Sequence, residues 1–90
     1  SMLIKLVEVN LNQQQSNVRE LYVNTASIIS ITAESRPRVL EEVKSLGFSN
    51  FTSFSTIVIN EGSNSRTITV AHSPDEINKK INSSKTLLKG

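Results

Sequence analysis

His72 has the side chain best suited to acid–base or metal chemistry, because it is the one histidine of a chain without cysteine. An imidazole catalyst needs a nucleophile within reach and a third group that orients it. Ser73 follows directly, but the motif Ser-Pro-Asp-Glu at 73–76 already explains that serine as the cap of a helix. We therefore expect His72 to lie at a strand-to-helix junction and to have no catalytic role.

Two adjacent acidic pairs, Glu41-Glu42 and Asp75-Glu76, are the next candidates for chemistry. Neighbouring residues on a helix point about 100° apart, so neither pair forms a carboxylate dyad. Helix solvation and the helix dipole account for both pairs. The absence of cysteine excludes thiolate nucleophiles and Cys-based zinc sites, and glycines at 47, 62 and 90 match no phosphate-binding loop. We expect no metal and no cofactor.

Cations and aromatic rings form a third set of candidates. The cations of 36–44 are close in sequence to Phe48, Phe51 and Phe54. Aromatic rings beside cations grip single-stranded nucleic acid, whereas an exposed Phe cluster marks a protein interface, and buried Phe rings mark only a core. Arginines together with Tyr22 could also clamp phosphates and stack a base. The predicted ligand or partner contacts are Tyr22, Arg36, Arg38, Phe48, Phe51 and Arg66.

Length and charge limit the protein classes that fit. Ninety residues are enough for one domain. Ten Lys and Arg residues against eight Asp and Glu residues give a net charge of +2, which argues against a dedicated nucleic-acid or membrane surface. No apolar run approaches the roughly 20 residues of a membrane span, and no signal-peptide pattern is present. Together with the lack of cysteine, this favours the cytoplasm.

Strand patterns dominate the chain. The segments 2–9, 18–23 and 26–32 are rich in apolar and β-branched residues, which favours strands. The segments 54–60 and 66–71 flank a short Gly-containing loop, which predicts a β-hairpin. Apolar spacing predicts a short helix over 38–46.

The motif at 73–76 predicts a C-terminal helix over 74–83. We expect one β-rich domain over 1–83 and a flexible tail over 84–90.

The predicted fold class is α+β: a curved antiparallel sheet of about five strands, SH3-like or a half-barrel, with an inserted helix and a C-terminal helix. Open sheets leave edge strands unpaired, and we expect the first and last strands to be those edges. Pairing between such edges would make the protein a homo-oligomer, most simply a dimer.

The order of elements resembles the small flagellar and swarming-motility proteins of the FlbD/SwrD type and many short bacterial and phage proteins. The matching pieces are MLIKLVEVN at 2–10, RELYVNTASIISI at 19–31, TIVINEGSNSRTITV at 56–70 and SPDEINKKI at 73–81. The segment 33–53 departs from the pattern as an insertion. The resemblance implies a non-enzymatic accessory protein and supplies no catalytic residues.

These observations favour a non-enzymatic protein-interaction or assembly module that binds itself and another protein. One alternative is a binding or sequestering protein for a small anionic, nucleotide-like ligand, of a kind that phages encode. A second alternative is binding of single-stranded nucleic acid, which predicts salt-dependent affinity.

Overall fold

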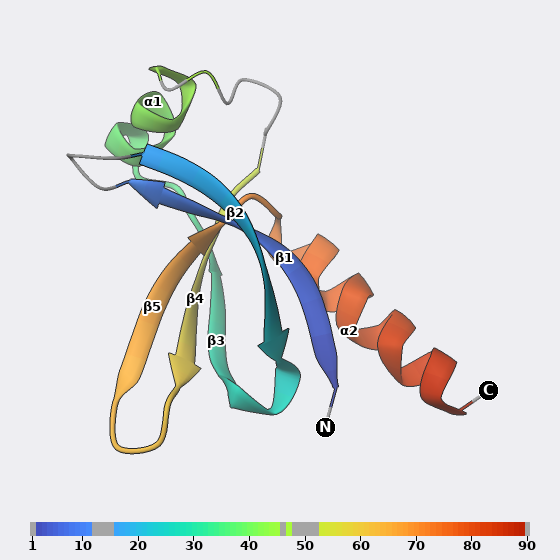
Figure 1. Cartoon of the computed structure of the whole chain (residues 1–90). Helices are drawn as coiled ribbons and strands as arrows, with labels where there is room; N and C mark the ends of the chain where they lie inside the picture. The colour runs from blue at the N-terminus through green and yellow to red at the C-terminus, as the bar shows by residue number, and fades with distance from the viewer. Residues whose placement is uncertain (1, 12–15, 46, 48–52, 90) are drawn as a thin grey trace.

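A computed structural model describes residues 2–11, 16–45, 47 and 53–89 (Figure 1). The five strands form one open antiparallel sheet in the order β2-β1-β5-β4-β3. The α+β class and the antiparallel five-stranded sheet are thereby confirmed. In chain order the elements are β1 (Leu3–Leu11), β2 (Ser16–Asn24), the 3₁₀ turn η1 (Thr25–Ser27), β3 (Ile28–Ala33), α1 (Pro37–Ser45), β4 (Ser55–Asn60), β5 (Ser65–Val70) and α2 (Pro74–Lys89).

The predicted hairpin is formed by β4 and β5, which pair from Ser55 opposite Val70 to Asn60 opposite Ser65. Gly62 in the connecting loop has a φ of +87°, a backbone conformation that residues with a side chain rarely adopt. The Asn60 side chain accepts a hydrogen bond of 3.1 Å from the Gly62 N–H group. Local turn chemistry therefore sets the register of this hairpin.

The edge strands are β2 and β3, so the prediction that the first and last strands form the edges is wrong. The first strand, β1, and the last, β5, pair with each other inside the sheet. Both edge strands follow each other along the chain, joined by η1, where the Asn24 side chain accepts a hydrogen bond from the Ala26 N–H group. Order along the chain is a poor guide to edges whenever a distant pairing forms.

The contact between β1 and β5 is short. Among the described residues its register consists of Glu8 opposite Val70. Beyond it, the Ala71 N–H group donates to the Val7 carbonyl at 2.9 Å, and the Val7 N–H group donates to Nε2 of His72 at 3.1 Å. We call these three contacts the β1–β5 junction. Figure 1 shows the β1–β2 hairpin crossing the end of β5 there.

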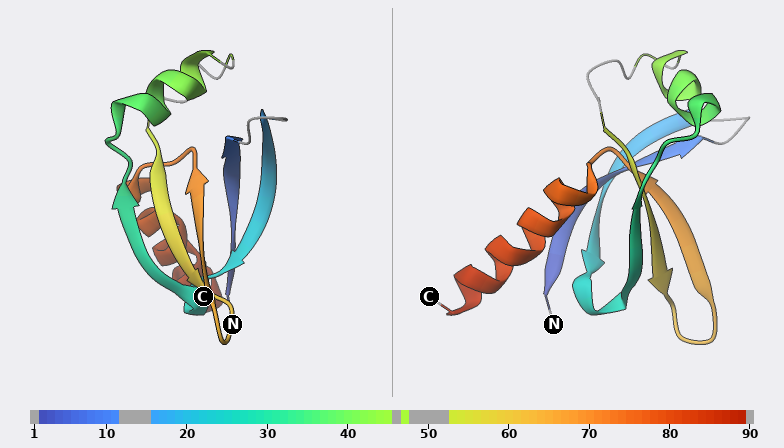
Figure 2. Two further views of the ribbon diagram at one scale, coloured as in Figure 1. Left: turned by 90° about the vertical axis from the view of Figure 1, so that its left-hand side faces the viewer. Right: turned by 180° about the vertical axis from the view of Figure 1, so that it is seen from behind.

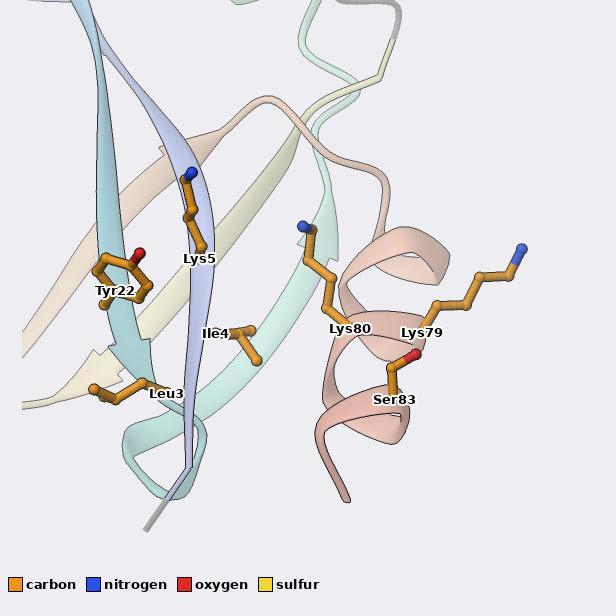
Figure 3. Close-up of a pocket in the computed structure, with 7 residues that line it drawn as sticks. All are labelled: Leu3, Ile4, Lys5, Tyr22, Lys79, Lys80 and Ser83. Carbon is orange, nitrogen blue, oxygen red and sulfur yellow. The ribbon is translucent and has the colours of Figure 1, made fainter. Parts of the chain in front are cut away.

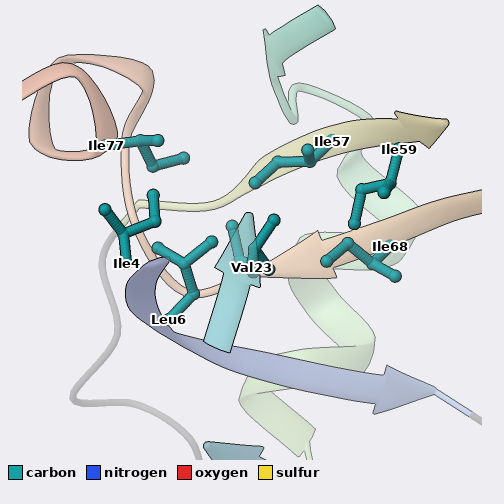
Figure 4. Packing of buried hydrophobic residues seen from close by; sticks show 8 residues of the cluster. Ile4, Leu6, Val23, Ile57, Ile59, Ile68 and Ile77 are labelled. Carbon is teal, nitrogen blue, oxygen red and sulfur yellow. The ribbon is translucent and has the colours of Figure 1, made fainter. Parts of the chain in front are cut away.

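The main core fills the space between the β1–β2 hairpin, the β3–β4–β5 part of the sheet and α2 (Figure 4). Strand alternation sends every second side chain inward, as the alternating burial along β4 shows. A smaller cluster of Val9, Phe54 and Ala71 has Leu40 of α1 packed against it. The buried residues of the main core are Ile4, Leu6, Val23, Ile57, Ile59, Ile68, Val70 and Ile77.

Helix α2 begins with the predicted capping box, which is confirmed. The Glu76 N–H group donates to Oγ of Ser73, and the Ser73 N–H group donates to Oε1 of Glu76, each at 3.1 Å. The helix runs on to Lys89, so the predicted end at 83 is too early. Ser83 and the residues after it include no proline, and no glycine before residue 90, so the sequence has no local signal that stops the helix there.

Helix α1 spans Pro37–Ser45, which confirms the helix predicted over 38–46 to within a residue at each end. Gly47 follows it with a φ of +88°, as expected for the residue after a helix end. In both views of Figure 2, α1 lies at the end of the molecule opposite the two chain termini. Among the described residues, no helix is long and apolar enough to cross a membrane.

Replacing Ile77 by alanine should lower the free energy of unfolding by about 2–5 kcal/mol, because this side chain is fully buried and its removal leaves a cavity. Chemical denaturation measures the change. Ile81→Ala, at a partly buried position on the same helix, is the matched control and should cost less. Equal losses in the two variants would show that Ile77 does not anchor α2.

Candidate functional site

A pocket of about 450 Å³ lies between α2 and the outer side of the β1–β2 hairpin (Figure 3). Helix α2 contacts β1 and β3, and Figure 2 shows it lying beside β1 in the view from behind. The volume falls within the range of about 300–1,000 Å³ that is usual for small-ligand sites. The described residues that line the pocket are Leu3, Ile4 and Lys5 of β1, Tyr22 of β2, and Lys79, Lys80 and Ser83 of α2.

The strand side of the pocket is largely apolar. Lys5 and Tyr22 lie directly opposite each other in the β1–β2 register, and Leu3 is two residues before Lys5, so the three share one face. Leu3 is 60% exposed and Tyr22 is 66% exposed. We call Leu3 and Tyr22 the apolar shelf. Ile4 points the other way, into the core, and closes the pocket between β1 and α2.

The helix side of the pocket is basic. Ser83 comes three residues after Lys80 and four after Lys79, so all three side chains lie near one another on the helix surface. In Figure 3 the Lys80 side chain reaches toward β1, whereas Lys79 extends away from it. Lys80 thus brings its ammonium group to the pocket, and Lys79 contributes its aliphatic part and a more distant charge.

The three lysines differ in their electrostatic environment. Lys5 forms an ion pair with Glu20, its diagonal neighbour on β2. No ion pair involves Lys79 or Lys80 among the residues that the structure describes. The positive charge that is not balanced by a carboxylate therefore comes from α2. An anion that reaches the ammonium group of Lys80 would form a charge-assisted hydrogen bond with it.

His72 lies at the β1–β5 junction, where its ring accepts a hydrogen bond that a backbone carbonyl accepts in an ordinary strand pair. Its Nε2 accepts the Val7 N–H group, so this nitrogen carries no proton and the neutral ring is protonated at Nδ1. Nδ1 faces Oε2 of Glu76 at 3.6 Å. Burial, followed by the positive charge of Lys80, lowers the pKa of His72, and Glu76 offsets part of that shift. The expected junction position of His72 is confirmed.

The backbone of His72 is also held in place. Its carbonyl accepts a hydrogen bond of 2.6 Å from Oγ of Ser55, a fully buried side chain on β4. Val7 of β1 therefore holds the His72 ring, and Ser55 of β4 holds the His72 carbonyl. The imidazole therefore has a structural task at its Nε2, and it does not line the pocket.

The arginines of the predicted contact set lie elsewhere. Arg36 forms a bidentate ion pair with Glu34, with Nη2 at 2.6 Å from Oε1, and this pairing lowers the pKa of Glu34. Arg66 pairs with Glu61 at 3.3 Å, and Arg38 is exposed on α1. None of these three arginines lines the pocket that Tyr22 lines. Phe48 and Phe51 lie outside the described residues.

Sequence reasoning missed Lys5, Lys79, Lys80 and Ser83 as binding candidates. In a helix predicted to end at 83, the helix dipole alone explains Lys79 and Lys80, so the sequence indicated no binding role for them. Helical spacing places Lys79, Lys80 and Ser83 on one surface, but nothing local indicates that this surface faces the strand of Lys5. Phe54, in contrast, is 6% exposed and belongs to the core.

No group of three or more acidic or histidine side chains among the described residues is placed to hold a metal ion. No protein-family model, curated protein or solved structure matches this chain. The resemblance to proteins of the FlbD/SwrD type therefore stays a prediction.

The pKa shift of His72 predicts a specific pH dependence of stability. At pH values well above the ordinary pKa of 6.5, the imidazole of His72 is neutral in the folded and in the unfolded chain, and its contribution to stability is fully present. As the pH falls through 6.5 the unfolded chain binds the proton first, because the folded pKa is lower, so the free energy of unfolding decreases. Denaturant titrations between about pH 7.5 and about pH 5 measure this slope.

The control is His72→Gln, which removes the titrating group and retains an oxygen that can accept a hydrogen bond. Its stability should be lower than that of the original protein near neutral pH and should change little across the same window. The pKa values of Glu34 and Glu76 are lowered from 4.5, so the stability that they contribute is lost as the pH falls through that value, at the acid end of the titration and below it. An unchanged slope in His72→Gln would rule out His72 as the source.

Proposed function

We propose that this protein is a non-catalytic binding module that captures a small anionic ligand in the pocket between α2 and the β1–β2 hairpin. The observation that carries the proposal is the presence of three lysines, a tyrosine and a serine around one pocket of about 450 Å³. Lysine and hydroxyl groups donate hydrogen bonds, and anions are the ligands that accept several of them at once.

The distribution of charge supports this proposal. Lys5 is balanced by Glu20, whereas Lys79 and Lys80 have no carboxylate partner among the described residues. Ammonium groups without a carboxylate beside them attract an anion, and the attraction is stronger at a partly apolar surface than in bulk water. No carboxylate is among the described lining residues, and the acidic group with which such a ligand would compete for Lys5 is its ion-pair partner Glu20.

The same lining residues favour binding without turnover. Neither an imidazole nor a carboxylate lines the pocket in the described part of the chain, so the lining itself offers neither of these groups as a general base. The one histidine is held at the β1–β5 junction by the Val7 N–H group. We therefore place capture, without bond making, at this site.

Lys80→Gln should weaken binding of inorganic pyrophosphate about tenfold or more, because a charge-assisted hydrogen bond contributes about 1.5–3 kcal/mol. Isothermal titration calorimetry at low ionic strength measures the dissociation constant, which should rise with added salt. Lys44→Gln, which removes an exposed lysine from α1, is the matched control and should leave the affinity unchanged. Absence of binding to the original protein, or an equal loss in both variants, would contradict the proposal.

A second candidate function is assembly with another copy of the chain, in line with the interaction role expected from the sequence. The open edge of β3 favours it, because Ile29 on this strand is a large apolar side chain that is 60% exposed. Unpaired strand edges present backbone donors and acceptors to a partner strand. The copy would add to this edge and cover Ile29.

Under this second candidate, sedimentation equilibrium should detect a dimer whose fraction rises with protein concentration. Ile29→Lys should shift the protein to monomer, because a buried ammonium group is costly at a newly formed interface. Thr32→Lys, at another exposed position of β3, should have a smaller effect. A monomer at all concentrations in the original protein would exclude assembly through this edge.

A further inference from the structure

We infer that the ligand of the pocket is a small aromatic phosphate, whose ring lies on the apolar shelf and whose phosphate lies between Lys80 and Lys5. This inference rests on the proposed function and adds the chemical class of the anion. A mononucleotide or another phosphorylated aromatic molecule has both required parts.

The first argument is the location of exposed apolar surface. Large apolar side chains that are well exposed are Leu3, Tyr22 and Ile29 among the described residues, and two of the three line this pocket. Leu3 and Tyr22 place exposed apolar surface beside the cations that line the pocket. An aromatic ligand would cover the shelf and remove that area from water.

The second argument is the geometry of the two walls. Tyr22 of β2 lies directly opposite Lys5 of β1. Figure 3 shows Lys80 of α2 reaching toward β1 from the other wall of the pocket. A ring that stacks on Tyr22 therefore has one ammonium group beside it and another across the pocket. Lys80 has no ion pair among the described residues and Lys5 shares its ammonium group with Glu20, and two such groups suit a doubly charged phosphate better than a single carboxylate.

The third argument concerns the size of the ligand. Proteins that hold single-stranded nucleic acid stack successive bases on several aromatic side chains. This pocket has one aromatic lining residue, Tyr22, and Phe54 is buried in the core. In the part of the chain that the structure describes, the site thus offers a platform for one ring and not for a strand.

The experiment compares matched ligands by isothermal titration calorimetry. Phenyl phosphate should bind about tenfold more tightly than methyl phosphate, because both carry the same charge and only one has a ring to stack. Adenosine monophosphate should likewise bind more tightly than ribose 5-phosphate, by a similar factor. These two pairs separate a general aromatic preference from recognition of a nucleotide base.

Substitutions test whether the apolar shelf causes the preference for a ligand with an aromatic ring. Tyr22→Ser should abolish the advantage of phenyl phosphate, whereas Tyr22→Phe should retain it. Val58→Ser, which removes a partly exposed apolar side chain of β4 outside the pocket, should leave both affinities unchanged. Lys80→Gln should weaken the binding of phenyl phosphate and of methyl phosphate by the same factor, since both ligands carry the phosphate group. Thermal unfolding of each variant verifies that it is folded.

The outcomes separate the two proposals. Equal binding of phenyl phosphate and methyl phosphate would overturn the ligand class and leave the anion site standing. Failure of every phosphate and of pyrophosphate to bind would overturn the anion site itself. Affinity for a single-stranded oligonucleotide that grows with its length and far exceeds that of the mononucleotide would overturn the small-ligand inference in favour of a strand-binding surface.

Discussion

The fold depends on two hydrogen bonds made by the backbone of one residue, Val7. Its carbonyl accepts the Ala71 N–H group and its own N–H group donates to the His72 ring, at 2.9 and 3.1 Å. These bonds continue a β1–β5 pairing whose described register is a single residue pair. Without them, the β1–β2 hairpin would be connected to the rest of the sheet mainly by side-chain packing, which constrains orientation less strictly than a hydrogen-bond ladder does.

The junction also decides where the last helix lies. His72 is followed at once by the Ser73 cap, so the direction in which α2 leaves the sheet is set within two residues. Ile77, about one turn into the helix, then enters the core, and Lys80 follows it toward β1. The charge of Lys80 in turn lowers the pKa of His72. The pocket and the junction are thus electrostatically coupled, and an anion beside Lys80 would ease protonation of His72.

Local sequence signals predicted those elements whose interacting residues are close to one another in the sequence. The capping box at Ser73 and Glu76 and the turn at Gly62 follow from residue types alone, and both are present. The strand class followed from β-branched runs. The β1–β5 pairing could not be predicted in this way, because no local feature of Val7 or Ala71 identifies the other as its partner. The error about the edges and the missed lysines share this cause, since Lys5 and Lys80 become neighbours only through that distant pairing.

The walls of the pocket come from segments far apart in the chain, with Leu3–Lys5 and Tyr22 on one side and Lys79, Lys80 and Ser83 on the other. During synthesis, a ribosome releases the first strand long before the last helix has left the exit tunnel. The nascent chain can form local hairpins during that time, but it cannot form this site. The two walls of the pocket can therefore meet only after α2 has emerged, and a fragment without α2 would lack the basic wall.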